Sequence, residues 1–214
     1  MRAVIATAEG RYRDPWHAFD ETSPALADAL TDAGFSCEIL PVDDALARLE
    51  GADLLAVNAG DPWRHDPLPS GAPDDAVAGL HAALARGIGV LAMHTSLASL
   101  RDYPDWPIAV GGMWLPGMSM HPPLSDAVLD WVDHPLAGSV PLAATDERYA
   151  YLQQLGNRDV VATHQHDGLA HPVVWTREHG SARVAVDLLG HDPRSYASNA
   201  HRALIARLAR WAAR

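Results

Sequence analysis

A chain of 214 residues, 48% apolar and 20% charged, is long enough to bury a large core and too apolar to be mainly disordered. Its formal net charge of -11 argues against binding to nucleic acid or to an anionic membrane surface, because both need a basic face. All 16 basic residues are arginines, which excludes chemistry that depends on a catalytic lysine.

The N-terminal residues enter a strand-like run directly, without the apolar segment of a signal peptide or a membrane span. Cys37 is the only cysteine, so an internal disulfide and a cysteine-based zinc site are excluded. We expect its thiol to be buried and unreactive, because no basic residue adjoins it. Together these features favour a cytoplasmic protein.

Strands and helices alternate through the first half of the chain. We expect strands at 2–7, 35–42, 52–59 and 87–94, and helices at 43–50 and 74–86. Ser23 is the expected N-cap of another helix, which ends at Gly34. Strands without polar alternation are buried on both faces. The pattern therefore predicts an α/β fold with a doubly wound, mostly parallel sheet and helices on both faces.

The second half of the chain is less regular. Residues 100–142 are rich in proline, glycine and tryptophan and are expected to be irregular. Strands are expected at 159–163, 172–175 and 183–188, followed by a helix over 198–213 with one apolar stripe. No internal repeat or linker divides the chain, so residues 1–214 are expected to form a single domain.

Two histidines occur where predicted strands end, which is where open α/β sheets bind ligands. His94 follows the fourth strand, at the place where a nucleophile-elbow enzyme carries serine or cysteine. A role as a helix cap is the alternative for His94. His191 follows the last predicted strand, directly after Gly190, which allows a close approach of the backbone.

The adjacent carboxylates Asp146 and Glu147 are further candidates. On an extended segment their side chains point to opposite sides, so only one of them would enter a site with the histidines. Pairing of these carboxylates with Arg148 is the alternative.

Other histidines are weaker candidates. His17 lies in the loop after the first strand, and His121 lies in the tryptophan-rich stretch. His164 and His166 would share a strand face and could bind a metal, but their spacing is unspecific, and we expect them to be ordinary polar residues at the surface.

Several of these residues belong to short motifs with a characteristic order and spacing. The motifs are His17, Gly87 to His94, Gly111-Gly112 leading to His121, Asp133-His134-Pro135-Leu136, Asp146-Glu147-Arg148-Tyr149, Pro172 to Trp175, and Arg183 to His191. Together they resemble the ThuA-like (trehalose utilisation) family over residues 3–211.

The resemblance implies a class I glutamine amidotransferase-like fold, a flavodoxin-like three-layer sandwich. His94 stands where those amidotransferases hold their catalytic cysteine, and Cys37 lies in an early strand, so amidotransfer by a thiolate is excluded. The resemblance also implies a sugar or keto-sugar substrate. A divalent metal such as zinc, held by His94 and His191, would suit a histidine-rich pocket.

The sequence leaves three hypotheses about function open. The first is an enzyme of disaccharide or keto-sugar metabolism, with a catalytic set of His94, His191, Asp146 and Glu147 and a substrate-binding set of His17, His121, Tyr149 and Trp114. The second is a non-catalytic sugar-binding or interaction module on the same fold. The third is a hydrolase that uses Ser96 or Ser99 with a histidine. In each case the expected partner is a small sugar, not nucleic acid or membrane, and a homodimer is the default assembly.

Overall fold

The computed structural model describes residues 1–60 and 71–214. The proline- and glycine-rich stretch 60–73, which the sequence predicts to be a loop, lies mostly outside the described residues. The central feature is a nine-stranded sheet in the order β2-β1-β3-β4-β11-β10-β9-β6-β7. A separate two-stranded sheet pairs β5 (Gly112–Met113) with β8 (Gln153–Gln154). None of the helices in the described ranges is long and apolar enough to cross a membrane.

One half of the large sheet is parallel. It consists of β1 (Arg2–Thr7), β2 (Ser36–Pro41), β3 (Leu54–Asn58), β4 (Gly89–Met93) and β11 (Ala182–Asp187). The expectation that the strands ending near residues 7, 59 and 94 are parallel neighbours is confirmed, because β1 pairs with β3 and β3 pairs with β4.

The other half is antiparallel. It consists of β10 (Leu169–His179), β9 (Asp159–His166), β6 (Ser125–Trp131) and β7 (Leu142–Asp146). The expectation that residues 100–142 are irregular is therefore wrong for β6, and also for the short helix α4 (Asp105–Val110). Local pattern fails here because β6 has no uninterrupted apolar run: its residues alternate between half-buried and exposed and are held by pairing with β7 and β9.

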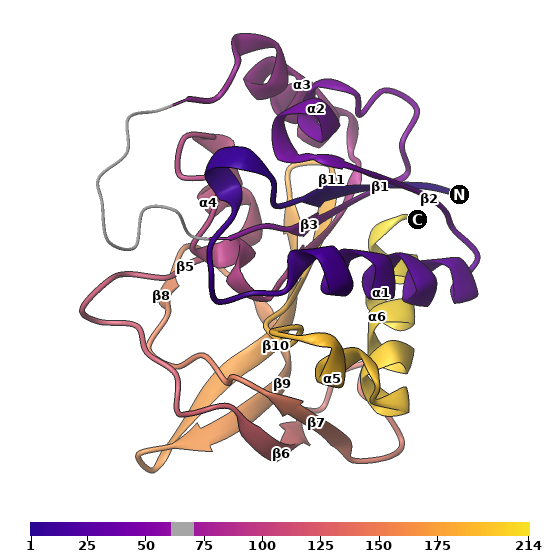
Figure 1. The fold of residues 1–214 in the computed structure, drawn as a ribbon. Helices are drawn as coiled ribbons and strands as arrows, with labels where there is room; N and C mark the ends of the chain where they lie inside the picture. The colour runs from indigo at the N-terminus through magenta and orange to yellow at the C-terminus, as the bar shows by residue number, and fades with distance from the viewer. Residues whose placement is uncertain (61–70) are drawn as a thin grey trace.

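Helices cover both faces of the parallel half, as expected (Figure 1). On one face lie α1 (Phe19–Asp32) and α6 (Asn199–Ala212), which pack against each other. On the other face lie α2 (Val42–Ala47), α3 (Asp74–Arg86) and α4, where His81 of α3 hydrogen bonds to Asp105 of α4. A short helix, α5 (Pro193–Tyr196), connects β11 to α6.

The start of α1 differs from the prediction. The helix begins at Phe19, and Ser23 lies inside it rather than at its N-cap. The Ser23 hydroxyl is buried, 2.7 Å from the Thr7 hydroxyl, and it accepts a hydrogen bond from the Asn58 side-chain amide at 3.0 Å. Ser23 therefore ties α1 to the ends of β1 and β3. Pro24 also lies inside the helix, where it has no backbone N–H to donate.

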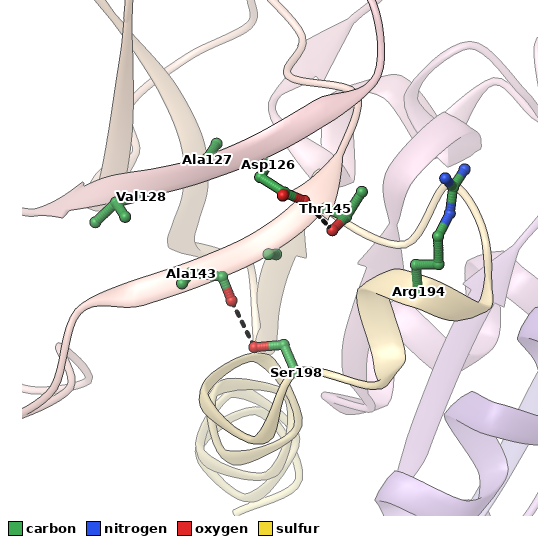
Figure 2. Close-up of a pocket in the computed structure, with 8 residues that line it drawn as sticks. Asp126, Ala127, Val128, Ala143, Thr145, Arg194 and Ser198 are labelled. Carbon is green, nitrogen blue, oxygen red and sulfur yellow. Dashed lines mark hydrogen bonds between the residues drawn. The ribbon is translucent and has the colours of Figure 1, made fainter.

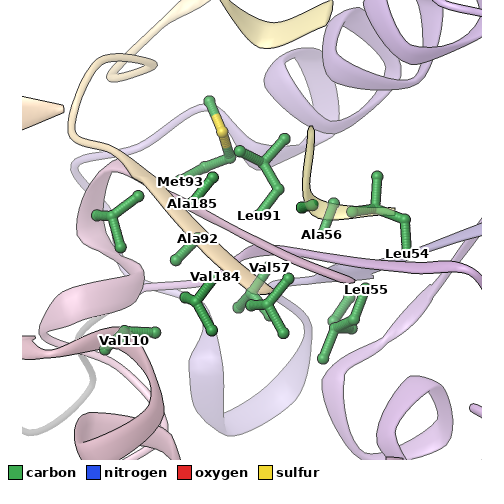
Figure 3. Packing of buried hydrophobic residues seen from close by; sticks show 14 of the residues in the cluster. Leu54, Leu55, Ala56, Val57, Leu91, Ala92, Met93, Val110, Val184 and Ala185 are labelled. Carbon is green, nitrogen blue, oxygen red and sulfur yellow. The ribbon is translucent and has the colours of Figure 1, made fainter. Parts of the chain in front are cut away.

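The core lies between the parallel strands and their helices. Fully buried aliphatic side chains of β3, β4 and β11 project from both faces of the sheet: Figure 3 shows Leu91 on one face and Leu55, Val57 and Val184 on the other. Burying such side chains contributes about 1.5–3 kcal/mol each relative to leaving them exposed. Cys37 lies outside this centre, on the edge strand β2, and is half-buried rather than fully buried as predicted.

The antiparallel half curls back toward the parallel half. In a flat sheet β7 would stand roughly 19 Å from β11, since four spacings of about 4.8 Å separate them. Instead Asp146, at the end of β7, accepts a hydrogen bond of 2.7 Å from the Gly190 backbone, just after β11. Two register irregularities between β9 and β10 are consistent with this bend. The curl brings the end of β7 to the carboxyl edge of the parallel strands.

Candidate active site

The backbone places His94 at a sharp turn. His94 is the first residue after β4, and its φ of 40° lies in the left-handed region that side chains other than glycine rarely adopt. Ala92 and Ser96 on either side are fully buried. The expected elbow is therefore present, and its strained backbone aims the His94 ring at the carboxyl edge of the sheet.

Hydrogen bonding fixes which nitrogen of His94 carries the proton. Nδ1 lies 2.8 Å from the Leu188 carbonyl oxygen, which can only accept, so Nδ1 donates. Burial lowers the pKa of His94 well below its usual value, and the nearby rings of His17 and His191 lower it further. The ring is therefore neutral, and its Nε2 carries a free electron pair. The Tyr149 hydroxyl, 3.2 Å away, donates to this atom.

His17 shows the same arrangement. Its Nδ1 lies 2.7 Å from Asp14 Oδ1, an oxygen that also accepts the backbone N–H groups of Trp16 and His17. Nδ1 therefore donates to a carboxylate, and the electron pair of His17 lies on Nε2. That atom is buried and has no hydrogen-bond partner among the described residues. Gly60 allows this geometry, because a Cβ there would lie 2.4 Å from Asp14 Oδ2.

Glu147 and His191 form a close pair. Glu147 Oε2 lies 3.2 Å from His191 Nδ1. Burial opposes charge on both groups, but their hydrogen bond and mutual attraction lower the pKa of Glu147 and raise the pKa of His191. His191 Nδ1 is also 3.3 Å from His94 Nε2, which joins the pair to the elbow.

Asp146 holds the backbone of the residues that carry the site. Its Oδ2 accepts the Gly190 N–H, and its Oδ1 accepts the N–H groups of Glu147 at 2.9 Å and His191 at 3.3 Å. Burial raises the pKa of Asp146 to about 6, although hydrogen bonds from Ser195 and Gly190 act to lower it. Of the two adjacent carboxylates, Glu147 points at the histidines and Asp146 holds the backbone that carries His191. Arg148 hydrogen bonds to Ser125 instead of these carboxylates.

Four side chains converge closely enough to hold a metal ion. One ligand atom from each of His17, His94, Glu147 and His191 lies within 4.8 Å of all the others. Tetrahedral zinc with bonds of about 2.0–2.1 Å keeps its ligands roughly 3.4 Å apart. His94 Nε2, His191 Nδ1 and Glu147 Oε2 are separated by 3.2, 3.3 and 3.8 Å, close to that spacing. The donor set therefore fits zinc or a similar divalent ion with little movement.

A cavity of about 180 Å³ opens beside this cluster. The aromatic ring of Trp114 packs edge-on against Tyr149, with centroids 4.7 Å apart, and the His121 ring lies 5.9 Å from each of them. His121 Nδ1 is also 3.5 Å from Glu147 Oε1. The cavity is lined by Asp14, Trp16, His17, Thr95, Ala98, Trp114, His121, Glu147 and Tyr149.

A larger cavity of about 540 Å³ lies elsewhere, between β6, β7 and the start of α6 (Figure 2). Its polar side chains already have partners: Thr145 bonds to Asp126, and Ser198 donates to the Ala143 carbonyl at 2.5 Å. Arg194 pairs with Asp192. No histidine lines it, so the chemistry favours the smaller cavity.

The serines do not support a hydrolase. The hydroxyls of Ser96 and Ser99 are buried and have no hydrogen-bond partner among the described residues, so neither contacts a histidine. Ser195, His201 and Asp187 do form a serine–histidine–aspartate chain, with contacts of 2.9 and 3.0 Å. All three residues are fully buried, so no substrate reaches them.

The expectation that His164 is an ordinary polar residue at the surface is wrong. His164 is only 2% exposed, and its Nε2 donates to the Tyr149 carbonyl at 2.9 Å. It therefore supports the segment that carries Glu147 and Tyr149. His166, on the same strand, is half-buried.

The structure brings together all eight side chains singled out from the sequence: His17, His94, His121, Asp146, Glu147, Tyr149, His191 and Trp114. Glu147 lies with His94 and His191 in one cluster, as expected for one of the two carboxylates, whereas His17, expected only in the substrate-binding set, also lies among the candidate metal ligands. Asp14 was missed. Its position three residues before His17, ahead of Pro15, is the one signal that could have identified it as the partner of that ring.

Comparisons with known proteins agree with this architecture. The family model ThuA, described as trehalose utilisation, matches residues 4–212. The comparison with curated proteins gave no match.

Three solved structures show the shared fold. A protein described as ThuA-like from Parabacteroides merdae is 20% identical, with a TM-score of 0.78 over 99% of this chain and 89% of its own. PurLQS from Thermotoga maritima, of the class I glutamine amidotransferase-like fold, is 16% identical, with a TM-score of 0.60 over 98% of both chains. The β-galactosidase from Rahnella sp. R3 is 17% identical, with a TM-score of 0.60 over 98% of this chain and 31% of its own.

Proposed function

The chain belongs to the ThuA family of trehalose utilisation, and from this membership we propose that it is an enzyme of disaccharide or keto-sugar metabolism. Its reaction centre would be the pocket at His17, His94, Glu147 and His191, with a divalent metal such as zinc held by these residues. We propose that it acts in the cytoplasm on a small sugar, as the sequence leads us to expect.

The observation that carries the proposal is that two histidines of the cluster, His17 and His94, both keep an unprotonated Nε2. His17 and His94 each donate Nδ1–H to a fixed acceptor, Asp14 or the Leu188 carbonyl, so both present Nε2. A histidine that binds a metal usually donates its other N–H to such a carboxylate or carbonyl. A buried Nε2 without a partner, as on His17, is costly unless something binds it.

When bound, the metal would polarise a sugar oxygen or lower the pKa of a water molecule. The remaining residues would orient the substrate and move protons. Burial and the Glu147 charge raise the pKa of Tyr149 well above its usual value, so its hydroxyl keeps its proton and remains a hydrogen-bond donor beside His94 Nε2. His121 lines the same cavity, with its Nδ1 3.5 Å from Glu147 Oε1, and is the candidate proton carrier.

The cavity suits one sugar ring. Its volume is about 180 Å³, and the indole of Trp114 and the ring of Tyr149 supply apolar faces for the sugar C–H groups. The charged and polar groups lie on the cluster side of the same cavity. A sugar would therefore stack on the aromatic side with its oxygens toward the histidines.

The test is metal analysis of the purified protein together with a turnover screen of disaccharides and their keto forms. We expect about one divalent ion per chain, lost in His17→Ala and His94→Ala. The matched control is His81→Ala. His81 is exposed on α3, pairs with Asp105 of α4 and does not belong to the cluster.

Protein that binds no metal and turns over none of these sugars would overturn the proposal. Saturable sugar binding without turnover would favour the alternative of a non-catalytic sugar-binding module. Turnover that survives in both the His17 and His94 variants would place the reaction elsewhere.

A further inference from the structure

A second, smaller cavity shares Tyr149 with the cavity beside the histidine cluster. Its volume is about 110 Å³, and it is lined by Tyr149, Tyr151, Leu152, Arg158, His171 and Pro172. A water molecule takes up about 30 Å³ in the liquid, so the space equals roughly three to four waters or one small oxyanion. Tyr149 lines this cavity as well as the larger one beside the cluster.

Arg158 brings an unpaired positive charge to this cavity. Its guanidinium carbon lies 4.7 Å above the Trp175 ring, and Nη1 is buried without a hydrogen-bond partner among the described residues. No ion pair of the described chain includes Arg158, and no aspartate or glutamate is among the lining residues. A half-buried cation without a counter-charge is unfavourable, so the position is suited to an anion from outside the chain.

His171 adds a second donor. It is 8% exposed, and its Nδ1 accepts the Tyr151 backbone N–H at 3.3 Å, with the Tyr151 ring packed edge-on at 4.6 Å. In the neutral ring the proton must then lie on Nε2. This Nε2 is buried, and it has no acceptor in the part of the chain that the structure describes.

We propose that this cavity is an oxyanion-binding site, in which Arg158 and His171 donate hydrogen bonds to a carboxylate or phosphate group. Arg158 Nη1 and His171 Nε2 have no hydrogen-bond partner among the described residues, no carboxylate lines this cavity there, and its volume matches a single small oxyanion. The site does not use the histidine cluster, so it stands or falls independently of metal binding. The oxyanion is either a free ion or the acidic group of a sugar derivative bound on the Tyr149 side.

The test is calorimetric titration of inorganic phosphate and of acetate into chelator-treated protein, so that neither ion can bind through a metal. We expect saturable binding that weakens about tenfold or more in Arg158→Gln and in His171→Phe, since each variant removes a donor. His171→Phe keeps a ring against Tyr151. The matched control is Arg207→Gln: Arg207 also lies over a tryptophan, 5.7 Å from the Trp131 ring, and also has a buried nitrogen without a partner.

Arg207 does not line the cavity, so its variant should bind like the unmodified protein. Titration of a hexose phosphate separates the two sources: tighter binding than inorganic phosphate indicates an acidic group on a sugar, and weaker binding indicates a free ion. The proposal is overturned if neither phosphate nor acetate binds saturably at millimolar concentration. Equal binding by Arg158→Gln and the unmodified protein would also overturn it, and the cavity would then hold water only.

Discussion

The buried pair of His201 and Asp187 allows a quantitative test of how the site is supported. His201 Nε2 lies 3.0 Å from Asp187 Oδ2, and both side chains are fully buried. His201 Nδ1 contacts Ser195, which in turn hydrogen bonds to Asp146, the residue that holds the His191 backbone. The pair is thus the far end of a chain of contacts leading to the histidine cluster.

The perturbation is His201→Leu, which removes one partner and leaves the Asp187 carboxylate buried without its counter-charge. Breaking a buried pair in this way costs about 3–5 kcal/mol in the free energy of unfolding. For a chain of this length, 1 kcal/mol changes the melting temperature by about 2–4 °C. The expected fall in melting temperature is therefore about 6–20 °C.

The assay is urea unfolding followed by circular dichroism, with Asp187→Asn and the double variant completing a mutant cycle. We expect the double variant to be more stable than His201→Leu alone, because it no longer buries an unpaired charge. A loss below about 1 kcal/mol in His201→Leu would refute the reasoning, given the range expected for a buried pair. A double variant no more stable than His201→Leu would refute it as well.

The pH dependence of the same variant provides a further check on the charge. Burial opposes protonation, but Asp187 raises the pKa of His201 above its usual value. A raised pKa in the folded state means that this stabilisation is fully present below the unfolded histidine value of about 6.5 and is lost as the pH rises through the folded value. The free energy of unfolding that is lost in His201→Leu should therefore be larger in mild acid than in alkali.

Three shorter predictions concern the site and the cysteine. Asp14→Ala should weaken metal binding about 10–100-fold in a chelator competition, because the His17 ring loses its partner, whereas Asp14→Asn keeps an acceptor and should lose less. Metal affinity should increase as the pH rises past about 6.5, because protons compete with the metal for the His191 ring. Burial opposes protonation of His191, but Glu147 raises its pKa above the usual value. A metal affinity that does not change in this pH range would contradict a role for His191 as a ligand. Burial raises the pKa of the Cys37 thiol, so labelling of the native protein should be slow, and Cys37→Ala should retain full activity.

The parallel half of the fold could be predicted because its signals are local. Uninterrupted apolar runs mark strands buried on both faces, and the residues that end these runs, such as His94 and His191, must lie at one edge of the sheet. Those two positions therefore followed from the pattern alone. The histidines met as expected because β4 and β11 are neighbours.

The antiparallel half could not be predicted in the same way. The position of Glu147 depends on a sheet that curls through β10, β9 and β6, and this curl results from distant pairings and bulges rather than from local propensity. The prediction that Ser23 caps a helix was wrong for a related reason. A serine before a proline matches a helix start, but here the hydroxyl has a tertiary role against Thr7 and Asn58.

The distribution of the cluster along the chain has a consequence for biosynthesis. His17 and His94 belong to the parallel half, whereas His191 lies 97 positions after His94. At about 5–20 residues per second, a ribosome needs roughly 5–20 s to translate that interval. During this time a nascent chain would present the candidate ligands His17 and His94 without His191 and, until residue 147 is made, without Glu147 as well. Loading of a metal should therefore follow synthesis of β11, and a product truncated before that strand would lack a complete site.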